Sequence, residues 1–234
     1  MNILITGASR GIGAAAYALL KKQGHRVVGH STKGSDVLIA GDLADPAAPR
    51  DIWDTALDEL GGNIEVLVNN AGVYEAIADN APDDEWHAAW ARTMTINLQA
   101  AADLCRLAVS HFMDRGGGGR IINIASRASF RGDSPQHWHY AASKAGMIGV
   151  TKTIARGYAN EGILCFGVAP GFTVSEMTAE YLQGRGGAQI VADIPLGRVA
   201  STEEVAEAIR WLAIEAPQSS TGTILDVNGA SYVR

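Results

Sequence analysis

The segment "YAASK" places Tyr140 and Lys144 four residues apart. In a helix this spacing puts both side chains on one face. A phenol has a pKa of about 10 and exchanges protons poorly near neutrality. A neighbouring ammonium stabilises the phenolate and lowers that pKa, which brings it toward the range of efficient proton transfer. The pair therefore predicts general acid–base chemistry, although the same spacing arises by chance in many helices.

Two further polar residues extend this candidate site. Ser126 ends the apolar segment "RIINIAS", where its hydroxyl is available to orient a carbonyl oxygen. Asn97, in "TINL", falls within a long helical stretch, where an asparagine is ordinarily satisfied by a neighbouring helix or by water.

A glycine turn near the start of the chain predicts a nucleotide site. The segment "ITGASRGIGA" carries Gly7, Gly11 and Gly13 directly after an apolar run. Glycines let the backbone approach a pyrophosphate, and the free N–H groups at a helix start favour its negative charge. The spacing G-x-x-x-G-x-G departs from the more familiar G-x-G-x-x-G, and a plain turn is the alternative interpretation. A P-loop is excluded because no Gly-Lys-Ser/Thr follows.

The residues after the second apolar run favour NADP(H) over NAD. An acidic side chain expected there would bind a ribose 2′-hydroxyl, but the sequence has Ser31. Thr32 and Lys33 follow, and Arg10 lies inside the glycine turn, so a 2′-phosphate would meet hydroxyls and cations. The alternative is that Arg10 and Lys33 are only solvated.

Two more segments are expected at the same edge. Asp42, in "GDLAD", is a candidate acceptor for the adenine amino group, or a cap for the following helix. The segment "VNNAG" contains Asn69 and would bring backbone close to a ligand, or would only satisfy its own turn.

The secondary structure around these residues alternates between strand and helix. Strand-like runs lie at 2–6, 26–30, 36–40, 64–70, 120–126, 163–169 and 223–227. Helix-like stretches lie at about 11–23, 47–60, 84–113, 138–160, 176–183 and 202–214. This alternation predicts a doubly wound parallel sheet of seven strands with helices on both faces, in which strand carboxyl ends form the cofactor crevice.

Composition limits the classes of function. The 234 residues suffice for one sizeable core and are short for two, so one domain over 1–234 is expected. The net charge of −6 and the lack of a Lys/Arg run give no support to nucleic acid or a membrane surface as partner. Cys105 and Cys165 stand in apolar segments outside any C-x-x-C pair, which predicts buried free thiols and a cytoplasmic protein.

Taken together, these motifs resemble the short-chain dehydrogenase/reductase family nearly from end to end. The matching segments are "TGASRGIG", "NNAG", "NIAS", "YAASK", "PGF" and "LDVNG". The resemblance implies a single Rossmann-fold domain, hydride transfer between NADP(H) and a carbonyl or alcohol substrate, and a homotetramer or homodimer. Within the family the sequence looks most like the 3-oxoacyl-carrier-protein reductases.

The resemblance also implies roles for individual residues. Tyr140 is the general acid or base, Ser126 binds the substrate oxygen, and Asn97 anchors a water that links Lys144 to solvent. Lys144 lowers the tyrosine pKa and binds the nicotinamide ribose. The cofactor-binding residues implied are Gly7, Ser9, Arg10, Gly11, Ile12, Gly13, Ser31, Thr32, Lys33, Asp42, Leu43, Asn69, Ala71, Gly72, Tyr140, Lys144, Pro170, Gly171, Thr173 and Ser175.

The chain departs from the family at the substrate end. Ser175 stands where threonine is more common, and Ser126 and Tyr140 are fourteen residues apart, one more than usual. Val73, Tyr74 and Phe172 are expected to face the substrate, and the stretch of about 176–195 resembles the family's substrate lid. A metal site at His137 and His139 is not expected, because no third ligand is evident.

Two alternative functions stay open at this point. The first is an NAD-dependent alcohol dehydrogenase of the same family. The second is a module of another class, a nucleotide sensor without catalysis, which would most simply show a broken catalytic set.

Overall fold

The computed structural model of the protein describes residues 1–174 and 187–234. Within them, parallel strands form one seven-stranded sheet in the order β3-β2-β1-β4-β5-β6-β7. The strands are β1 (Asn2–Ile5), β2 (Arg26–Ser31), β3 (Leu38–Ala40), β4 (Val66–Asn69), β5 (Gly119–Ile124), β6 (Ile163–Pro170) and β7 (Ile224–Val227). The strand order reverses between β1 and β4, which confirms the predicted doubly wound fold.

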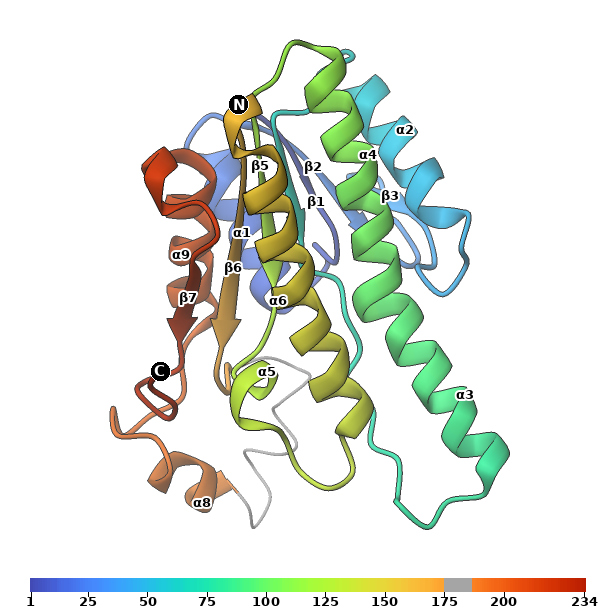
Figure 1. The fold of residues 1–234 in the computed structure, drawn as a ribbon, viewed down its shortest axis with the longest axis vertical. Helices are drawn as coiled ribbons and strands as arrows, with labels where there is room; N and C mark the ends of the chain where they lie inside the picture. Colours follow the sequence, from blue (N-terminus) through green and yellow to red (C-terminus); the bar gives the residue numbers. More distant parts are fainter. Residues whose placement is uncertain (175–186) are drawn as a thin grey trace.

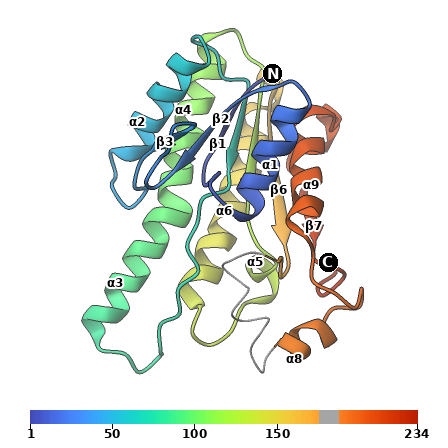
Figure 2. The same ribbon diagram turned by 180° about the vertical axis from the view of Figure 1, so that it is seen from behind.

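Helices cover both faces of this sheet. They are α1 (Gly11–Lys22), α2 (Ala48–Glu59), α3 (Asp83–Met94), α4 (Ala100–Asp114), α5 (Ala128–Arg131), α6 (Trp138–Tyr158), α8 (Gly187–Ala192) and α9 (Thr202–Ile214), with short turns of other helix types at Thr95–Gln99, Ala159–Glu161 and Gln218–Ser220. Helices α2, α4 and α6 lie over one face (Figure 1). Helices α1 and α9 lie side by side over the other (Figure 2).

The two faces of the sheet bury separate hydrophobic clusters because successive strand residues point in opposite directions. Along β1, Leu4 packs into the cluster under α2 and α4, whereas Ile3 and Ile5 pack into the cluster under α1 and α9. All three side chains are fully buried, and each such burial contributes roughly 1.5–3 kcal/mol. This two-sided burial explains why the strands are apolar throughout.

The structure differs from the sequence prediction in the long helix over 84–113. Its middle, Thr95–Gln99, is a π-helical turn that joins α3 to α4. Such turns insert one extra residue into a helix and are frequent at functional sites. The short helix α5 also lies in a loop where the sequence pattern predicts no helix. The predicted helix at 176–183 lies outside the described residues, as does most of the predicted lid.

Two further observations concern the cysteines and the possibility of membrane-spanning helices. Cys105 and Cys165 are free and buried, as predicted. Among the described residues, no helix is both long enough and apolar enough to cross a membrane.

Candidate active site

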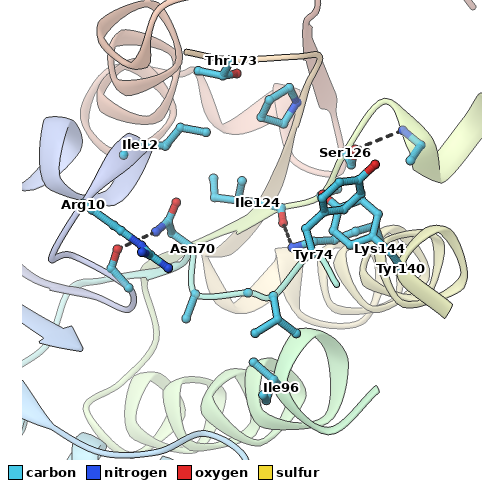
Figure 3. A pocket seen from close by; sticks show the side chains of 18 of the residues that line it. Arg10, Ile12, Asn70, Tyr74, Ile96, Ile124, Ser126, Tyr140, Lys144 and Thr173 are labelled. Carbon is cyan, nitrogen blue, oxygen red and sulfur yellow. Dashed lines mark hydrogen bonds between the residues drawn. The ribbon is translucent and has the colours of Figure 1, made fainter. Parts of the chain in front are cut away.

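A cavity of about 580 Å³ opens at the carboxyl ends of the strands. Figure 3 shows Arg10, Ile12 and Asn70 at one end, and Tyr74, Ser126, Tyr140 and Lys144 at the other. The predicted residues that line it are Gly7, Ser9, Arg10, Gly11, Ile12, Ser31, Thr32, Asp42, Leu43, Ala71, Gly72, Ser126, Tyr140, Lys144, Pro170, Gly171 and Thr173. The structure therefore brings together residues that are spread over most of the sequence.

Five predicted residues do not stand in this lining. Gly13, Lys33, Asn69 and Asn97 do not line the cavity, and Ser175 is outside the described residues. Of these, Gly13, Asn69 and Asn97 support the wall from inside the protein, as the contacts below show.

The glycine turn is held tightly against the end of β4. The Asn70 side-chain amide donates hydrogen bonds to the carbonyls of Thr6 and Gly7, both at 3.0 Å. Gly7 has a φ of 68°, in the left-handed region, and a Cβ on Gly13 would lie 2.1 Å from the Gly7 carbonyl oxygen. Helix α1 can thus begin directly beneath the turn only because residue 13 has no side chain.

The start of α1 is suited to an anion. Its N-cap, Arg10, makes no side-chain capping hydrogen bond, and no acidic residue stands in the first helical turn. The first N–H groups of a helix lack partners within it, and together with the helix dipole they favour a phosphate. This end of the cavity therefore fits the pyrophosphate of a dinucleotide.

Asn69 and Asn70 have different environments although they are adjacent. The Asn69 amide donates to Asn123 Oδ1 at 2.9 Å and to the Ala101 carbonyl at 3.3 Å, and its side chain is buried between β4 and α4. Asn70 lines the cavity instead. The residue of "VNNAG" that contacts the cavity is thus shifted by one from the predicted Asn69, because neighbouring residues of a strand point to opposite faces.

The last residue of β2 is Ser31, which lines the cavity where an acidic side chain would favour NAD. Ser31 is buried there, and its hydroxyl accepts a hydrogen bond from the Gly34 amide at 3.1 Å. The preceding His30 also lines the cavity, with Nε2 2.8 Å from the Gly41 carbonyl and Nδ1 3.5 Å from the Gly7 amide. Burial lowers the His30 pKa, which favours the neutral form of the ring that joins the glycine turn to the end of β3.

Asp42 also lines the cavity, but one of its oxygens is engaged locally. Its Oδ1 accepts a hydrogen bond from the Ala44 amide at 3.0 Å. The adenine alternative fits this position, since the second carboxylate oxygen remains to accept a hydrogen bond. The helix-cap alternative is wrong, because α2 begins at Ala48, its N-cap is Ala47, and no side chain caps it.

Tyr140 and Lys144 stand in the first two turns of α6, beside the end of β5. The Lys144 ammonium donates to the Ile124 carbonyl at 2.8 Å (Figure 3), and its nitrogen lies 6.0 Å from the centre of the Tyr140 ring. Ser126 lies two residues beyond that carbonyl. These three side chains thus meet where β5 ends and α6 begins.

The pKa values of the pair differ from the expectation. Burial raises the pKa of the Tyr140 phenol to about 12, and the Ser126 side chain opposes this rise in part. Burial lowers the pKa of the Lys144 ammonium to about 8. The sequence pattern predicts that the lysine lowers the tyrosine pKa, but its charge is held by a backbone carbonyl rather than by the phenol. In this structure desolvation is the largest cause of both pKa shifts.

Asn97 is fully buried in the π-helical turn. Its side chain accepts a hydrogen bond from the Val73 amide at 2.8 Å and donates to the Val73 carbonyl at 3.0 Å. A Cβ on Gly72 would lie 3.2 Å from Asn97 Oδ1 and 3.4 Å from Lys144 Nζ. Asn97 therefore fastens the loop after β4 beside Lys144, and does so without lining the cavity.

The substrate end of the cavity is aromatic and basic. Tyr74 packs edge-on against Tyr140, with ring centres 4.8 Å apart, and stacks on His137 at 3.9 Å. Val73 and Phe172 line this end too. Arg92, Arg127 and Arg131 also lie in its wall. Among the described residues, no group of three His, Cys, Asp or Glu side chains is placed to hold a metal ion.

Several lining residues do not follow from the sequence motifs. Asn70, His30 and the three arginines of the substrate end belong to this group. Asn70 is the second member of "NNAG" and could have been identified there. No sequence motif identifies the arginines as lining residues, because a charged residue is usually exposed to solvent.

Comparison with known proteins places these features in context. A family model described as short chain dehydrogenase matches residues 1–186. The 3-oxoacyl-[acyl-carrier-protein] reductase FabG of Salmonella typhimurium is 36% identical over 98% of this chain and 96% of its own length. The 3-oxoacyl-[acyl-carrier-protein] reductase of Synechocystis is also 36% identical, over 97% of this chain and 94% of its own length.

Two solved structures have the same architecture. A short chain dehydrogenase from Burkholderia cenocepacia in complex with NADP has a TM-score of 0.87 and 28% identity, covering 98% of this chain and 97% of that one. Ligand-free aldohexose dehydrogenase of Thermoplasma acidophilum has a TM-score of 0.86 and 27% identity, covering 99% and 94%.

Proposed function

The chain belongs to the short chain dehydrogenase family, and we propose that it is an NADP(H)-dependent carbonyl reductase. The observation that carries the proposal is a single cavity with a glycine turn at one end and Tyr140, Ser126 and Lys144 at the other. The names of the relatives and the NADP complex of the Burkholderia structure support it. The substrate is a small or medium keto compound, with 3-oxoacyl-carrier-protein as one candidate.

The residues of the catalytic end would act in one proton transfer. When bound, the reduced nicotinamide supplies a hydride to the carbonyl carbon. Tyr140 donates its phenolic proton to the carbonyl oxygen, so that the product is an alcohol. Ser126 donates a hydrogen bond to the same oxygen and orients it. In the reverse direction the Tyr140 phenolate accepts the proton.

Lys144 and Asn97 would serve this transfer indirectly. The Lys144 ammonium would hold ribose hydroxyls and stabilise the phenolate that remains after proton donation. Asn97 would position the loop at Val73 and hold a water that returns protons to Lys144 from solvent.

The proposed cofactor preference depends on the absence of an acid at the end of β2. Gly7, Ser9, Gly11 and Ile12 would surround the pyrophosphate. Ser31, Thr32 and Arg10 would surround the 2′-phosphate, with Lys33 adding charge nearby. The remaining cofactor contacts would come from Asp42, Leu43, Ala71, Gly72, Pro170, Gly171, Thr173 and Ser175.

A panel of carbonyl compounds tests this function directly. Purified protein is mixed with NADPH or NADH and each compound, and oxidation is followed by the loss of reduced-nicotinamide absorbance. We expect turnover with at least one ketone or ketoester and a higher kcat/KM with NADPH. Binding of NADPH without turnover of any compound would instead favour the nucleotide-sensing alternative.

We also propose a homotetramer, or failing that a homodimer, in the cytoplasm. Trp138 at the start of α6 is 53% exposed and packs edge-on against Trp86 of α3, which leaves an exposed aromatic side chain on this helix pair. The two buried free thiols agree with a reducing compartment.

A further inference from the structure

Arg127 directly follows Ser126 and lines the same cavity. Its backbone amide donates to the Pro170 carbonyl at 2.8 Å, which fixes the segment between β5 and α5 against the end of β6. Its guanidinium lies 5.2 Å from the centre of the Phe172 ring. The cation is therefore held at the substrate end, one residue from the hydroxyl proposed to orient the carbonyl.

This guanidinium has no counter-ion in the part of the chain that the structure describes. No carboxylate there forms an ion pair with it, and no acceptor takes a hydrogen bond from it. The two other arginines of the substrate end differ in this respect. Arg92 pairs with Glu75 at 3.3 Å, and Arg131 pairs with Asp193 at 2.9 Å.

The surroundings of Arg127 make an unpaired charge unfavourable. The residue is half-buried, and desolvation lowers its pKa, yet a guanidinium stays protonated in proteins. Two carboxylates act on this charge from a distance without pairing with it, Asp193 and Asp133. Asp193 instead pairs with Arg131, and Asp133 accepts hydrogen bonds from the Tyr74 hydroxyl at 3.2 Å and the Ser134 amide at 2.7 Å. Partly buried charges in proteins are normally paired, so a ligand is the natural source of the missing anion.

We propose that Arg127 binds an anionic oxygen group of the substrate, either a carboxylate or a phosphate. A guanidinium presents paired N–H donors that match both groups. Ser126 and Arg127 are adjacent and both line the substrate end, so the anionic group and the reacting carbonyl belong to one substrate molecule. The substrate is thus a keto acid or a keto phosphate. This inference rests on the proposed function, which places the carbonyl at Ser126 and Tyr140.

Matched pairs of substrates test the inference. The pairs are 3-oxobutanoate with its methyl ester, and dihydroxyacetone phosphate with dihydroxyacetone. We expect wild-type kcat/KM with NADPH to favour the anionic member of one pair by about 10-fold or more, since charge-assisted hydrogen bonds have that effect. The pair that shows the preference distinguishes a carboxylate from a phosphate.

Variants then assign the preference to Arg127. Arg127→Gln should lower kcat/KM for the anionic member by about 10-fold or more and leave the neutral member within about threefold. Arg127→Lys should keep part of the preference, because it keeps the charge but loses the paired donors. Arg50→Gln removes an exposed arginine of α2 outside the cavity and should leave both rates unchanged.

The outcomes separate this inference from the function on which it rests. Equal wild-type rates for anionic and neutral members, or a preference that survives Arg127→Gln, would overturn the role of Arg127 while carbonyl reduction stands. If the wild type reduces no carbonyl compound, neutral or anionic, the proposed function fails and this inference fails with it.

Discussion

At the scale of single residues, the phenol of Tyr140 is the group on which the proposed chemistry depends. Tyr140→Phe keeps the ring and removes the proton donor. We expect kcat to fall by about 10²–10⁴-fold, while NADPH affinity measured by fluorescence titration stays near the wild-type value. Tyr158→Phe, at the far end of α6, is the matched control and should retain full activity. A Tyr140→Phe enzyme with more than about a tenth of wild-type kcat would contradict the role of the phenol.

The burial of Lys144 predicts a pH dependence of stability. Its pKa is about 8 in the folded protein against 10.5 for an ordinary lysine. Between these pH values the unfolded chain binds more protons than the folded one, so stability rises with pH. We expect the free energy of unfolding of the wild type, relative to Lys144→Met, to increase from about pH 8 to 10.5, by at most about 1.4 kcal/mol per pH unit.

Urea unfolding at a series of pH values measures this difference. Lys152→Met, which removes an exposed lysine from the same helix, controls for the loss of a lysine from α6. The raised pKa of Tyr140 lowers stability as the pH rises above about 10, but Tyr140 is present in both proteins and its effect cancels in the difference. A wild-type advantage that does not change between pH 8 and 10.5 would show that the lysine is not desolvated.

Ser31 is the residue at which the cofactor preference should be reversible. A carboxylate in Ser31→Asp would repel a 2′-phosphate and could accept hydrogen bonds from a free ribose diol. We expect the ratio of kcat/KM for NADPH to that for NADH to fall by about 10-fold or more, measured at one ionic strength. Ser35→Asp adds the same charge to an exposed site in the following turn and should leave the ratio nearly unchanged. A wild type that prefers NADH would mean that another group recognises the ribose.

At the scale of elements, the glycine turn and α1 form one tightly packed unit. A Cβ at position 13 would overlap the Gly7 carbonyl, whereas a Cβ on the exposed Gly149 of α6 would meet no neighbouring atom within 4 Å. We expect Gly13→Ala to destabilise the protein by about 1–3 kcal/mol and to weaken NADPH binding. Gly149→Ala should stabilise it by about 0.5–1 kcal/mol, because it removes a glycine from a helix interior.

Urea denaturation and NADPH titration of both variants test this pair. Both substitutions add one methyl group. If they change the free energy of unfolding in opposite directions, the effect at position 13 comes from the close approach of α1 to the turn. If Gly13→Ala were as stable as the wild type and bound NADPH normally, the turn would not require that approach.

At the scale of the whole molecule, the exposed tryptophan of α6 bears on assembly. The chain has a mass of 24.6 kDa, and the proposed tetramer or dimer should give a multiple of it by light scattering. Trp138→Glu replaces this exposed aromatic side chain, which packs against Trp86, with a charge and should shift the measured mass toward that of a smaller assembly. Val37→Glu changes an exposed residue between β2 and β3 and is expected to leave the mass unchanged. A monomeric wild type would refute the proposed assembly.

The order of the elements and the identity of the family could both be predicted from the sequence. Apolar runs that alternate with helical patterns are local signals, and they sufficed for the doubly wound sheet that the structure confirms. The family motifs are likewise short and contiguous, and the family assignment from "YAASK" and its companions is confirmed. Both predictions succeed because each signal lies within a few neighbouring residues.

The properties that depend on distant neighbours required the folded chain. Only packing against β5 shows that Lys144 is held by the Ile124 carbonyl and that burial moves its pKa and that of Tyr140 apart. Only the pairing of β4 with its neighbours places Asn70, rather than Asn69, at the cavity. The unpaired charge of Arg127 is equally invisible in sequence. The desolvation and the charge pairing of a side chain depend on residues that are distant in the sequence, so a local sequence pattern does not reveal them.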